Sequence, residues 1–269
     1  QKTAYEIRPR DWSSDVCSSD IDGPNESYLL ALNPGRRKDL WRHVRPSQAR
    51  EESLEAFSSP VPFTAKGRTE LLIVGGDDVS GHEPGTGREI WRWGTWNNQR
   101  IGHWRLVPSP VGGGGVVLAC APKGSPVFAV KAGGSGTLDN GAIAWQSADR
   151  ELSSDVSTPL FYRGRFYVMN SDKRKLFAVE PATGRILSSL ALSTKAKVES
   201  SPTGADGKIY FLSHSGDLTC VEAGDTLKEL HVANMADGTE RDLRSSVAIA
   251  HNQLFVRTGG KLYCIGRKH

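Results

Sequence analysis

The sequence predicts an all-β protein, a β-propeller of four-stranded blades of which about five to six are present. Three observations predict it: short apolar segments recur every 42 to 50 residues, each recurrence contains four short strands, and a tryptophan follows two of them at the same distance. Four strands per unit of this length are typical of a propeller blade. A solenoid has similar periodicity, but the strand count and the tryptophans favour the propeller.

The repeat is clearest at a small residue in the middle of each apolar segment. Successive members are 50, 48, 49, 42 and 44 residues apart, and the column is Ala31, Gly81, Ala129, Ala178, Cys220 and Cys264. We interpret it as a crowded position on an inner strand, and expect its alanines and cysteines to be buried. Trp41 and Trp91 follow the small residue by ten positions, and Trp145 by sixteen because residues 133–140 are inserted. We expect these three rings to fill a slot between adjacent blades.

Within a unit, turn residues divide the apolar segments into strands. In one unit, residues 159–169 predict two strands around an Arg163-Gly164 turn, Lys175–Val179 a third strand, and a fourth beginning near Arg185. Residues 199–231 repeat this pattern, with Asp206-Gly207 as a hairpin signal. Each unit starts at a Ser or Thr, followed by Pro in all but the last: Ser59, Ser109, Thr158, Ser201 and Ser246.

Composition excludes several classes of protein. Of 269 residues, 34 are basic and 30 acidic, so the net charge of +4 is too balanced to indicate nucleic-acid binding. The longest apolar run, residues 116–121, is far shorter than a membrane span. The four cysteines contain no Cys-x-x-Cys pair, which argues against a zinc ribbon and a disulfide scaffold.

Residues 1–20 do not follow the repeat and resemble an in-frame translation of a sequencing-library adapter, most closely over Asp11–Asp20. We therefore exclude them from the fold, give Trp12 and Cys17 no function, and expect the segment to be disordered and to make no contact with the propeller. The propeller domain is assigned to residues 21–269. We expect the natural N-terminus, with one or more blades and any signal segment, to be missing.

The segments Ala178–Arg185 and Gly81–Trp91 resemble the PQQ-like (pyrroloquinoline-quinone-like) β-propeller repeat, Ala-x-Asp-x-x-Thr-Gly-x-x-x-Trp. The resemblance covers roughly residues 28–266, and the repeats are similar to those of the outer-membrane assembly lipoprotein type. Residues 35–38 and 223–227 depart from the motif. That family also contains quinoprotein dehydrogenases. The resemblance implies a propeller outside the cytoplasm, periplasmic or secreted.

The usual chemical motifs are absent from the sequence. The resemblance implies that a quinone site needs adjacent cysteines, but Cys120, Cys220 and Cys264 are far apart. No histidine pair has metal-ligand spacing, and no Gly-x-Ser-x-Gly turn is present. Residues 112–115, four glycines, are interpreted as a hairpin turn rather than a phosphate loop. His82 replaces an apolar residue of its column, and we interpret it as a hydrogen-bonded strand-end histidine, with ligand binding as the alternative.

The candidate ligand or partner surface lies on the loop from Trp93 to Val107, which leads to the Ser109 start of the next unit. Its aromatic and cationic side chains suit a sugar, an anion or an acidic peptide, and the alternative is that they plug the channel and hold the blades together. Glu199 and Arg244, each one residue before a Ser pair, are expected to form an ion pair on the same face. The candidate residues are Trp96, Arg100, His103, Trp104, Arg105, Glu199 and Arg244.

Three functions remain open from the sequence. The first is a non-enzymatic extracytoplasmic scaffold that binds a protein or a cell-envelope polymer; the others are a fragment of a quinoprotein dehydrogenase and a propeller domain of a larger protein. For the first we expect a monomer with no cofactor, metal or catalytic residue, no nucleic-acid partner and no membrane span.

Overall fold

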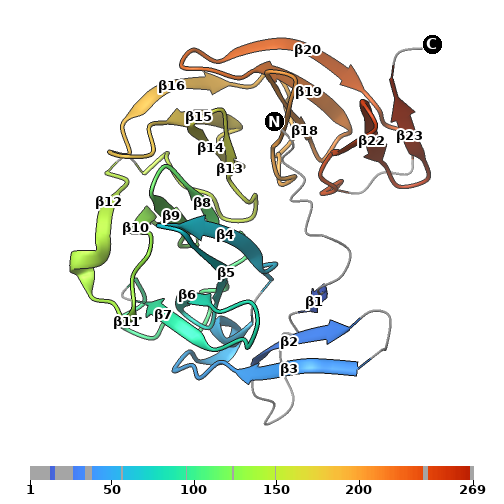
Figure 1. Ribbon diagram of the computed structural model, residues 1–269. Helices are drawn as coiled ribbons and strands as arrows, with labels where there is room; N and C mark the ends of the chain where they lie inside the picture. Colours follow the sequence, from blue (N-terminus) through green and yellow to red (C-terminus); the bar gives the residue numbers. More distant parts are fainter. Residues whose placement is uncertain are drawn as a thin grey trace.

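The computed structural model contains six β-sheets that follow one another along the chain in an open arc (Figure 1). It describes residues 13–15 (backbone only), 27–33, 38–55, 57–94, 96–122, 124–148, 150–238 and 242–266. We number the sheets 1 to 6 in chain order. The arc begins at β2 and β3 and ends at β22 and β23, with the first strand of each complete sheet toward the middle. The expected all-β propeller architecture is confirmed.

The first three sheets occupy the N-terminal half of the chain. Sheet 1 contains β1 (Ser13–Asp15), β2 (Tyr28–Asn33) and β3 (Lys38–Val44). Sheet 2 contains β4 (Val61–Ala65), β5 (Arg68–Gly75), β6 (Asp78–His82) and β7 (Glu89–Trp93), and sheet 3 contains β8 (Val111–Gly113), β9 (Val116–Cys120), β10 (Val127–Lys131) and β12 (Ile143–Gln146).

Two short 3-10 helices and one extra strand lie between these elements. Helix η1 (Glu51–Leu54) precedes sheet 2, and η2 (Asn140–Ala142) precedes β12. The residues inserted before η2 form β11 (Gly136–Thr137), which pairs in parallel with β7 and makes a fifth strand of sheet 2. The insertion that displaces Trp145 in the sequence therefore straps sheet 3 to sheet 2.

The last three sheets are the most regular. Sheet 4 contains β13 (Leu160–Tyr162), β14 (Arg165–Asn170), β15 (Lys175–Val179) and β16 (Ile186–Ala191). Sheet 5 contains β17 (Thr203–Ala205), β18 (Lys208–Leu212), β19 (Asp217–Glu222) and β20 (Lys228–Asn234). Sheet 6 contains β21 (Ala248–Ala250), β22 (Gln253–Arg257) and β23 (Leu262–Ile265).

The first two strands of sheets 2 to 6 are joined by two-residue hairpins of one type. Arg163 and Gly164 have φ of 49° and 75°, and Asp206 and Gly207 have 48° and 71°. Positive φ at both positions defines the type I′ turn, whose twist matches the flanking strands and which favours Asn, Asp or Gly. Both predicted hairpins are confirmed, and the turn expected within residues 112–115 is formed by Gly114 and Gly115.

In sheets 2 to 6 the small residues lie on the third strand, and in sheet 1 Ala31 lies on β2, so the assignment to the strand nearest the middle was wrong. In the first three sheets the small residue is paired across the strands with the tryptophan that follows it: Ala31 with Trp41, Gly81 with Trp91 and Ala129 with Trp145. In sheets 4 and 5 the partners are Ser188 and His231. A Cβ on Gly81 would overlap the Trp91 indole. In the first three sheets the column is therefore small because its cross-strand neighbour is large.

Burial of this column depends on whether another sheet covers it. Ala31, Ala129 and Ala178 are fully buried, as expected. Cys220 is only half-buried and Cys264, on the last sheet, is exposed, so the expectation was wrong for both cysteines. The third cysteine, Cys120, is buried between sheets 3 and 4, where desolvation raises the pKa of its thiol to about 12.

Two of the tryptophans connect one sheet to the next through a glycine turn. The indole Nε1 of Trp41 donates to Pro84 O at 3.1 Å, and that of Trp145 donates to Pro181 O at 2.7 Å. A Cβ on Gly87 or Gly184, in the same two turns, would overlap the respective ring. Trp145 is buried and Trp41 is half-buried. Trp91 is buried and instead donates to the carboxylate of Glu70 in its own sheet.

A second connection runs through the Ser or Thr that starts each sheet. The backbone N–H of each such residue donates to the hydroxyl of the next one, over 2.9, 3.0, 3.0 and 2.9 Å. We call this series the hydroxyl ladder; it passes through Ser59, Ser109, Thr158, Ser201 and Ser246. The repeated hydroxyl therefore has a structural role at each junction from sheet 2 to sheet 6.

Apolar side chains fill four of the five junctions between sheets. Separate buried clusters join sheets 2 and 3, 3 and 4, 4 and 5, and 5 and 6. Sheet 1 contacts sheet 2 differently, through Trp41 and through charged and polar groups that include the buried Arg45 and His82.

The expectation that residues 1–20 make no contact with the propeller was wrong for three of them. Ser13, Ser14 and Asp15 form β1, which pairs antiparallel with Leu30 to Leu32 of β2. The remaining residues of this segment, Trp12 and Cys17 included, lie outside the described part of the chain.

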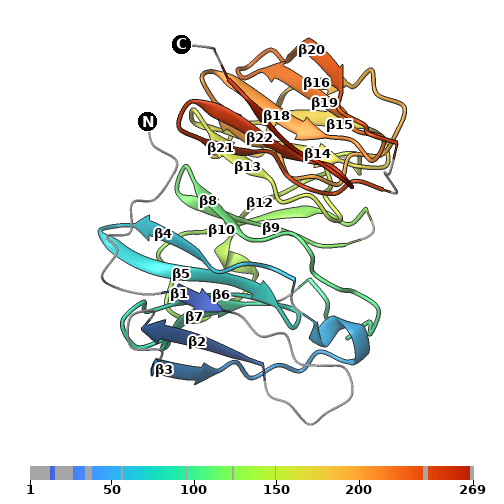
Figure 2. The same cartoon turned by 90° about the vertical axis from the view of Figure 1, so that its right-hand side faces the viewer.

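The alternating strands give the arc two distinct faces. The two-residue hairpins and the third-to-fourth strand connections lie on one, which we call the hairpin face. The loops from one sheet to the next lie on the other, which we call the junction face. Figure 2 shows the β4–β5 hairpin on its left side and η1 on its right.

Candidate functional site

The predicted loop connects sheet 2 to sheet 3 on the junction face, and its first aromatic residues point inward. Trp93 is fully buried, and Trp96 is half-buried against the cluster between sheets 2 and 3. Their rings meet edge to face with centroids 4.9 Å apart, and Phe128 of β10 lies 5.2 Å from Trp93. Trp96 thus packs against the interior.

Arg100 is held by groups from two other segments. Its Nη2 donates to Gln48 Oε1 at 2.8 Å, and its Nη1 lies 3.4 Å from the buried carboxylate of Asp77. Asn97 also donates to Asp77, at 2.8 Å. Desolvation nevertheless raises the pKa of Asp77. Arg100 therefore neutralises a buried carboxylate, and its guanidinium is largely engaged.

The end of the loop is fixed to η1 through Ser53, which is fully buried. Ser53 donates its N–H to Gly102 O at 2.8 Å and its hydroxyl to Ile101 O at 2.7 Å, and the hydroxyl accepts from Trp104 N at 3.0 Å. Arg105 pairs with Glu52 at 3.4 Å. Two loops about fifty residues apart in the sequence thereby form one surface.

This surface exposes apolar side chains beside charged ones. Leu54 and Phe57 are 43% and 53% exposed, Arg105 and His103 are exposed, and Trp104 is half-buried. We call residues 51–57 without 56, together with 100–105, the two-loop surface. Sequence reasoning located His103, Trp104 and Arg105 but missed Leu54 and Phe57. Two large apolar residues in the charged segment from Arg50 to Phe57 were the available signal.

Glu199 and Arg244 form the expected ion pair, with Arg244 Nε 2.6 Å from Glu199 Oε2. The same oxygen contacts His214 Nε2 at 2.9 Å, and Asp242 lies 3.4 Å from His214 Nδ1. Hydrogen bonds from Arg244 and His214 outweigh desolvation and lower the pKa of the Glu199 carboxyl. This cluster joins the junctions before sheets 5 and 6, whereas the two-loop surface joins those before sheets 2 and 3.

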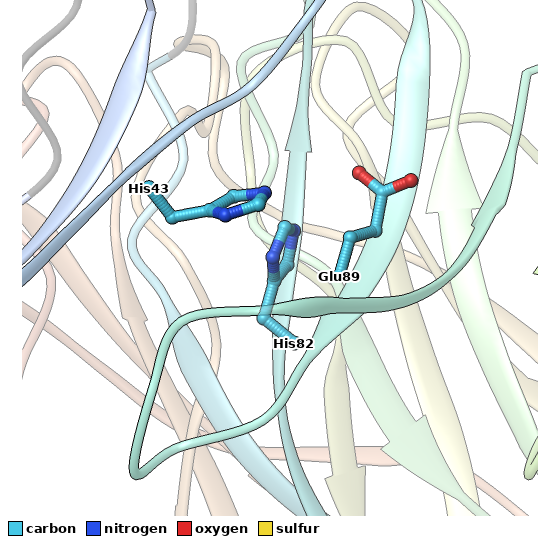
Figure 3. A group of neighbouring side chains, drawn as sticks. All are labelled: His43, His82 and Glu89. Carbon is cyan, nitrogen blue, oxygen red and sulfur yellow. The ribbon is translucent and has the colours of Figure 1, made fainter.

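A histidine group lies where sheet 1 contacts sheet 2. His43 of β3, His82 of β6 and Glu89 of β7 each place a ligand atom within 4.8 Å of the others (Figure 3). The two imidazole rings meet edge to face, with centroids 5.4 Å apart.

The hydrogen bonds of these three side chains indicate a structural contact rather than a metal centre. His82 Nδ1 donates to Gly87 O at 2.9 Å, and its Nε2 accepts from Ser80 Oγ at 2.9 Å, so both ring nitrogens are in use. Glu89 accepts two hydrogen bonds from Arg92, at 2.9 and 2.6 Å. Desolvation lowers the pKa of His82 to about 4, which keeps it neutral. We assign this group to sheet docking, which matches the hydrogen-bonded histidine expected at position 82.

None of the helical stretches in the described residues has the length and apolar character needed to cross a membrane.

Solved structures share the fold at low sequence identity. BamB from Moraxella catarrhalis is 13% identical with a TM-score of 0.60, over 95% of this chain and 72% of that one. Quinohemoprotein alcohol dehydrogenase from Comamonas testosteroni is 14% identical with a TM-score of 0.57, over 79% of this chain and 41% of that one. Saccharomyces cerevisiae Sqt1 is 12% identical with a TM-score of 0.58, over 92% and 67%. These similarities show the fold alone.

A search of curated proteins gives no significant match. In contrast, the family described as "Outer membrane protein assembly factor BamB" matches residues 25–269, which is nearly the whole chain. This match agrees with the PQQ-like repeat motif and the four-stranded sheets. The chain belongs to the outer membrane protein assembly factor BamB family.

Proposed function

We propose that this chain is a non-enzymatic scaffold that acts outside the cytoplasm and binds a protein of outer-membrane assembly through its two-loop surface. The observation that carries the proposal is the combination of Phe57, Leu54 and Trp104 with Arg105 on a surface held rigid by Ser53. Aromatic residues and arginine dominate the binding energy of protein interfaces.

The construction of the surface also supports binding. Ser53 fixes both loops with three hydrogen bonds, so little conformational entropy is lost when a partner binds. Arg105 and Glu52 are about half exposed and form a charged rim beside the apolar side chains. An apolar centre with a polar rim is the usual anatomy of an interface. The Glu199–Arg244 pair adds charged groups to the same junction face.

The experiment measures binding of the purified chain to two ligands: an outer-membrane β-barrel protein diluted from urea, and cell-wall polymer. We expect binding to the unfolded barrel protein, weakened at least tenfold in Phe57→Ser and in Trp104→Ala and weakened in Arg105→Ala. Leu262→Ser, which changes a leucine that is 69% exposed on sheet 6, is the matched control and should bind normally.

Two results would contradict the proposal. Binding that is unchanged in both Phe57→Ser and Trp104→Ala would remove the two-loop surface from the site, and binding to polymer alone would assign a different partner. Titration with calcium and pyrroloquinoline quinone tests the non-enzymatic part. Stoichiometric quinone binding with dye-linked alcohol oxidation would refute it.

A further inference from the structure

The cations of the two-loop surface are already paired in the folded chain. Taken alone, the loop from Trp93 to Val107 favours a sugar, an anion or an acidic peptide, because its ionised side chains are arginines. In the structure, Arg100 pairs with the buried carboxylate of Asp77, and Arg105 pairs with Glu52, each at 3.4 Å. Neither guanidinium is therefore free to hold an anionic partner, and Arg105 contributes to the surface mainly through its apolar stem.

Two carboxylates of the same surface, those of Glu51 and Glu55, form no hydrogen bond or ion pair with any residue that the structure describes. Glu51 is exposed and has φ of 50°. Its side chain lies across Gly102, where an added Cβ would come within 2.5 Å of Glu51 Oε2. The missing side chain at position 102 thus makes room for the Glu51 carboxylate, which is held where the two loops meet.

Glu55 differs from Glu51 because it is nearly buried. It directly follows η1, and only 8% of its surface is exposed. Its backbone N–H donates to Glu52 O at 3.1 Å, but its carboxylate has no partner within the described part of the chain. Removing a carboxylate from water without pairing it is unfavourable. A cation supplied by a binding partner would therefore gain most at this position.

The charge balance of the two-loop surface is negative even when Asp77 beneath it and the exposed Arg50 before it are included. Four described carboxylates stand against three guanidinium groups: Glu51, Glu52, Glu55 and Asp77 against Arg50, Arg100 and Arg105. The chain as a whole carries the opposite sign, +4. Attraction of a basic partner would thus come from this surface and not from the net charge of the molecule.

We propose that the two-loop surface binds a basic, apolar segment of its protein partner, in which a lysine or arginine lies beside aromatic or aliphatic residues. The cation pairs with the carboxylates of Glu51 and Glu55, and the apolar residues pack on Leu54, Phe57 and Trp104. Such a cation is also attracted to the face of an indole ring, which Trp104 supplies. This partner chemistry rests on the function proposed above and narrows it to segments of one charge.

The first experiment changes the surface and keeps the partner. Binding of the urea-diluted outer-membrane β-barrel protein is measured for Glu51→Gln and Glu55→Gln, each of which removes one charge and keeps the size of the side chain. We expect each variant to bind about two- to fivefold more weakly, the effect of one exposed ion pair, and high salt to reduce the difference. Glu222→Gln, which changes an exposed carboxylate at the end of β19, is the matched control and should bind normally.

The second experiment changes the partner and keeps the surface. Three synthetic peptides alternate phenylalanine with serine and carry lysine, glutamine or glutamate at the central position. Titrations of the ¹⁵N-labelled chain follow the backbone amide signals of Gly102 and Trp104. We expect the lysine peptide to bind about two- to fivefold more tightly than the glutamine peptide, and the glutamate peptide to bind most weakly. In the Glu51→Gln/Glu55→Gln double variant the three peptides should bind alike.

Affinity for the barrel protein that is unchanged or higher in Glu51→Gln and Glu55→Gln would overturn the proposed partner chemistry. Equal binding of the three peptides, tightest binding of the glutamate peptide, or no shift with the lysine peptide would overturn it as well. The proposed function survives these results if Phe57→Ser and Trp104→Ala still weaken binding of the barrel protein. If those two variants bind normally, the function proposed for the surface fails too. Thermal unfolding of each variant checks that the chain is folded.

Discussion

The tryptophan–glycine contact between sheets makes a quantitative prediction for Gly184→Ala. Gly184 has φ of +74°, and an added Cβ would lie 2.5 Å from Trp145 Cδ2. Placing alanine at this φ costs about 1–2 kcal/mol. Forcing a methyl group against a buried ring costs about a further 1–3 kcal/mol. We therefore expect Gly184→Ala to lower the free energy of unfolding by about 2–5 kcal/mol.

A second glycine isolates the contact with the ring. Gly164 has φ of +75°, but an added Cβ there meets no atom within 4 Å. Gly164→Ala should therefore cost only the backbone part, about 1–2 kcal/mol. Urea denaturation of both variants measures the difference, provided that their m-values agree.

The double variant completes the argument. In a Trp145→Leu background the ring is absent, so Gly184→Ala should then cost no more than Gly164→Ala. The reasoning is refuted if Gly184→Ala and Gly164→Ala destabilise the wild-type chain equally, because the added methyl group would then have met no obstacle.

Three further predictions concern other junctions. Trp91→Ala should lower the free energy of unfolding by about 3–5 kcal/mol, since it empties a buried site; a loss under about 1 kcal/mol in urea denaturation would show that the ring does not fill a slot. Thr158→Val keeps the side-chain volume but removes one acceptor of the hydroxyl ladder, so it should lower the free energy of unfolding by about 0.5–1.5 kcal/mol in the same assay. An unchanged stability would argue against the ladder. His82 stays neutral in the folded state, where its pKa is about 4. Its contribution to the free energy of unfolding is therefore complete above pH 6.5 and decreases as the pH is lowered, by roughly 2 kcal/mol at pH 5. His82→Gln should remove that loss, measured as the difference in stability between pH 7.5 and pH 5, although Asp78, whose pKa burial raises to about 6, acts in the opposite direction in both chains.

Local features of the fold could be predicted because local residues determine them. The turns at Arg163-Gly164 and Asp206-Gly207 need positive φ, which their glycines supply, and the alternation of the flanking strands fixes their register. The period of the repeat likewise depends only on the spacing of apolar segments. These features predicted the four-stranded units and their order along the chain.

Position within a sheet and between sheets could not be predicted in the same way. The repeat does not state which strand is nearest the middle, so the small column was placed on the wrong strand. Cys264 occupies the same column position as Ala178, but no described sheet covers its side of sheet 6. Burial of this position depends on whether a neighbouring sheet covers it, so the residue type alone does not predict it.

The candidate surface could likewise be predicted only in part. Composition identified the loop that contains Trp104 and Arg105, because aromatic and cationic residues are concentrated there. It did not indicate that Trp96 turns inward, or that Ser53 brings Leu54 beside the loop. Both depend on contacts between residues that are distant in the sequence.

The hydroxyl ladder has a consequence for how such a chain changes over evolutionary time. Each of its contacts joins a main-chain amide to a hydroxyl, and neither group depends on the remaining side chains of the unit. A unit can therefore be duplicated, deleted or exchanged without loss of this contact, provided that it begins with Ser or Thr. The polar contact of sheet 1 with sheet 2 and the β11 strap are specific to their own positions. The first three sheets thus form a segment of fixed order, joined to later units that are interchangeable at this contact.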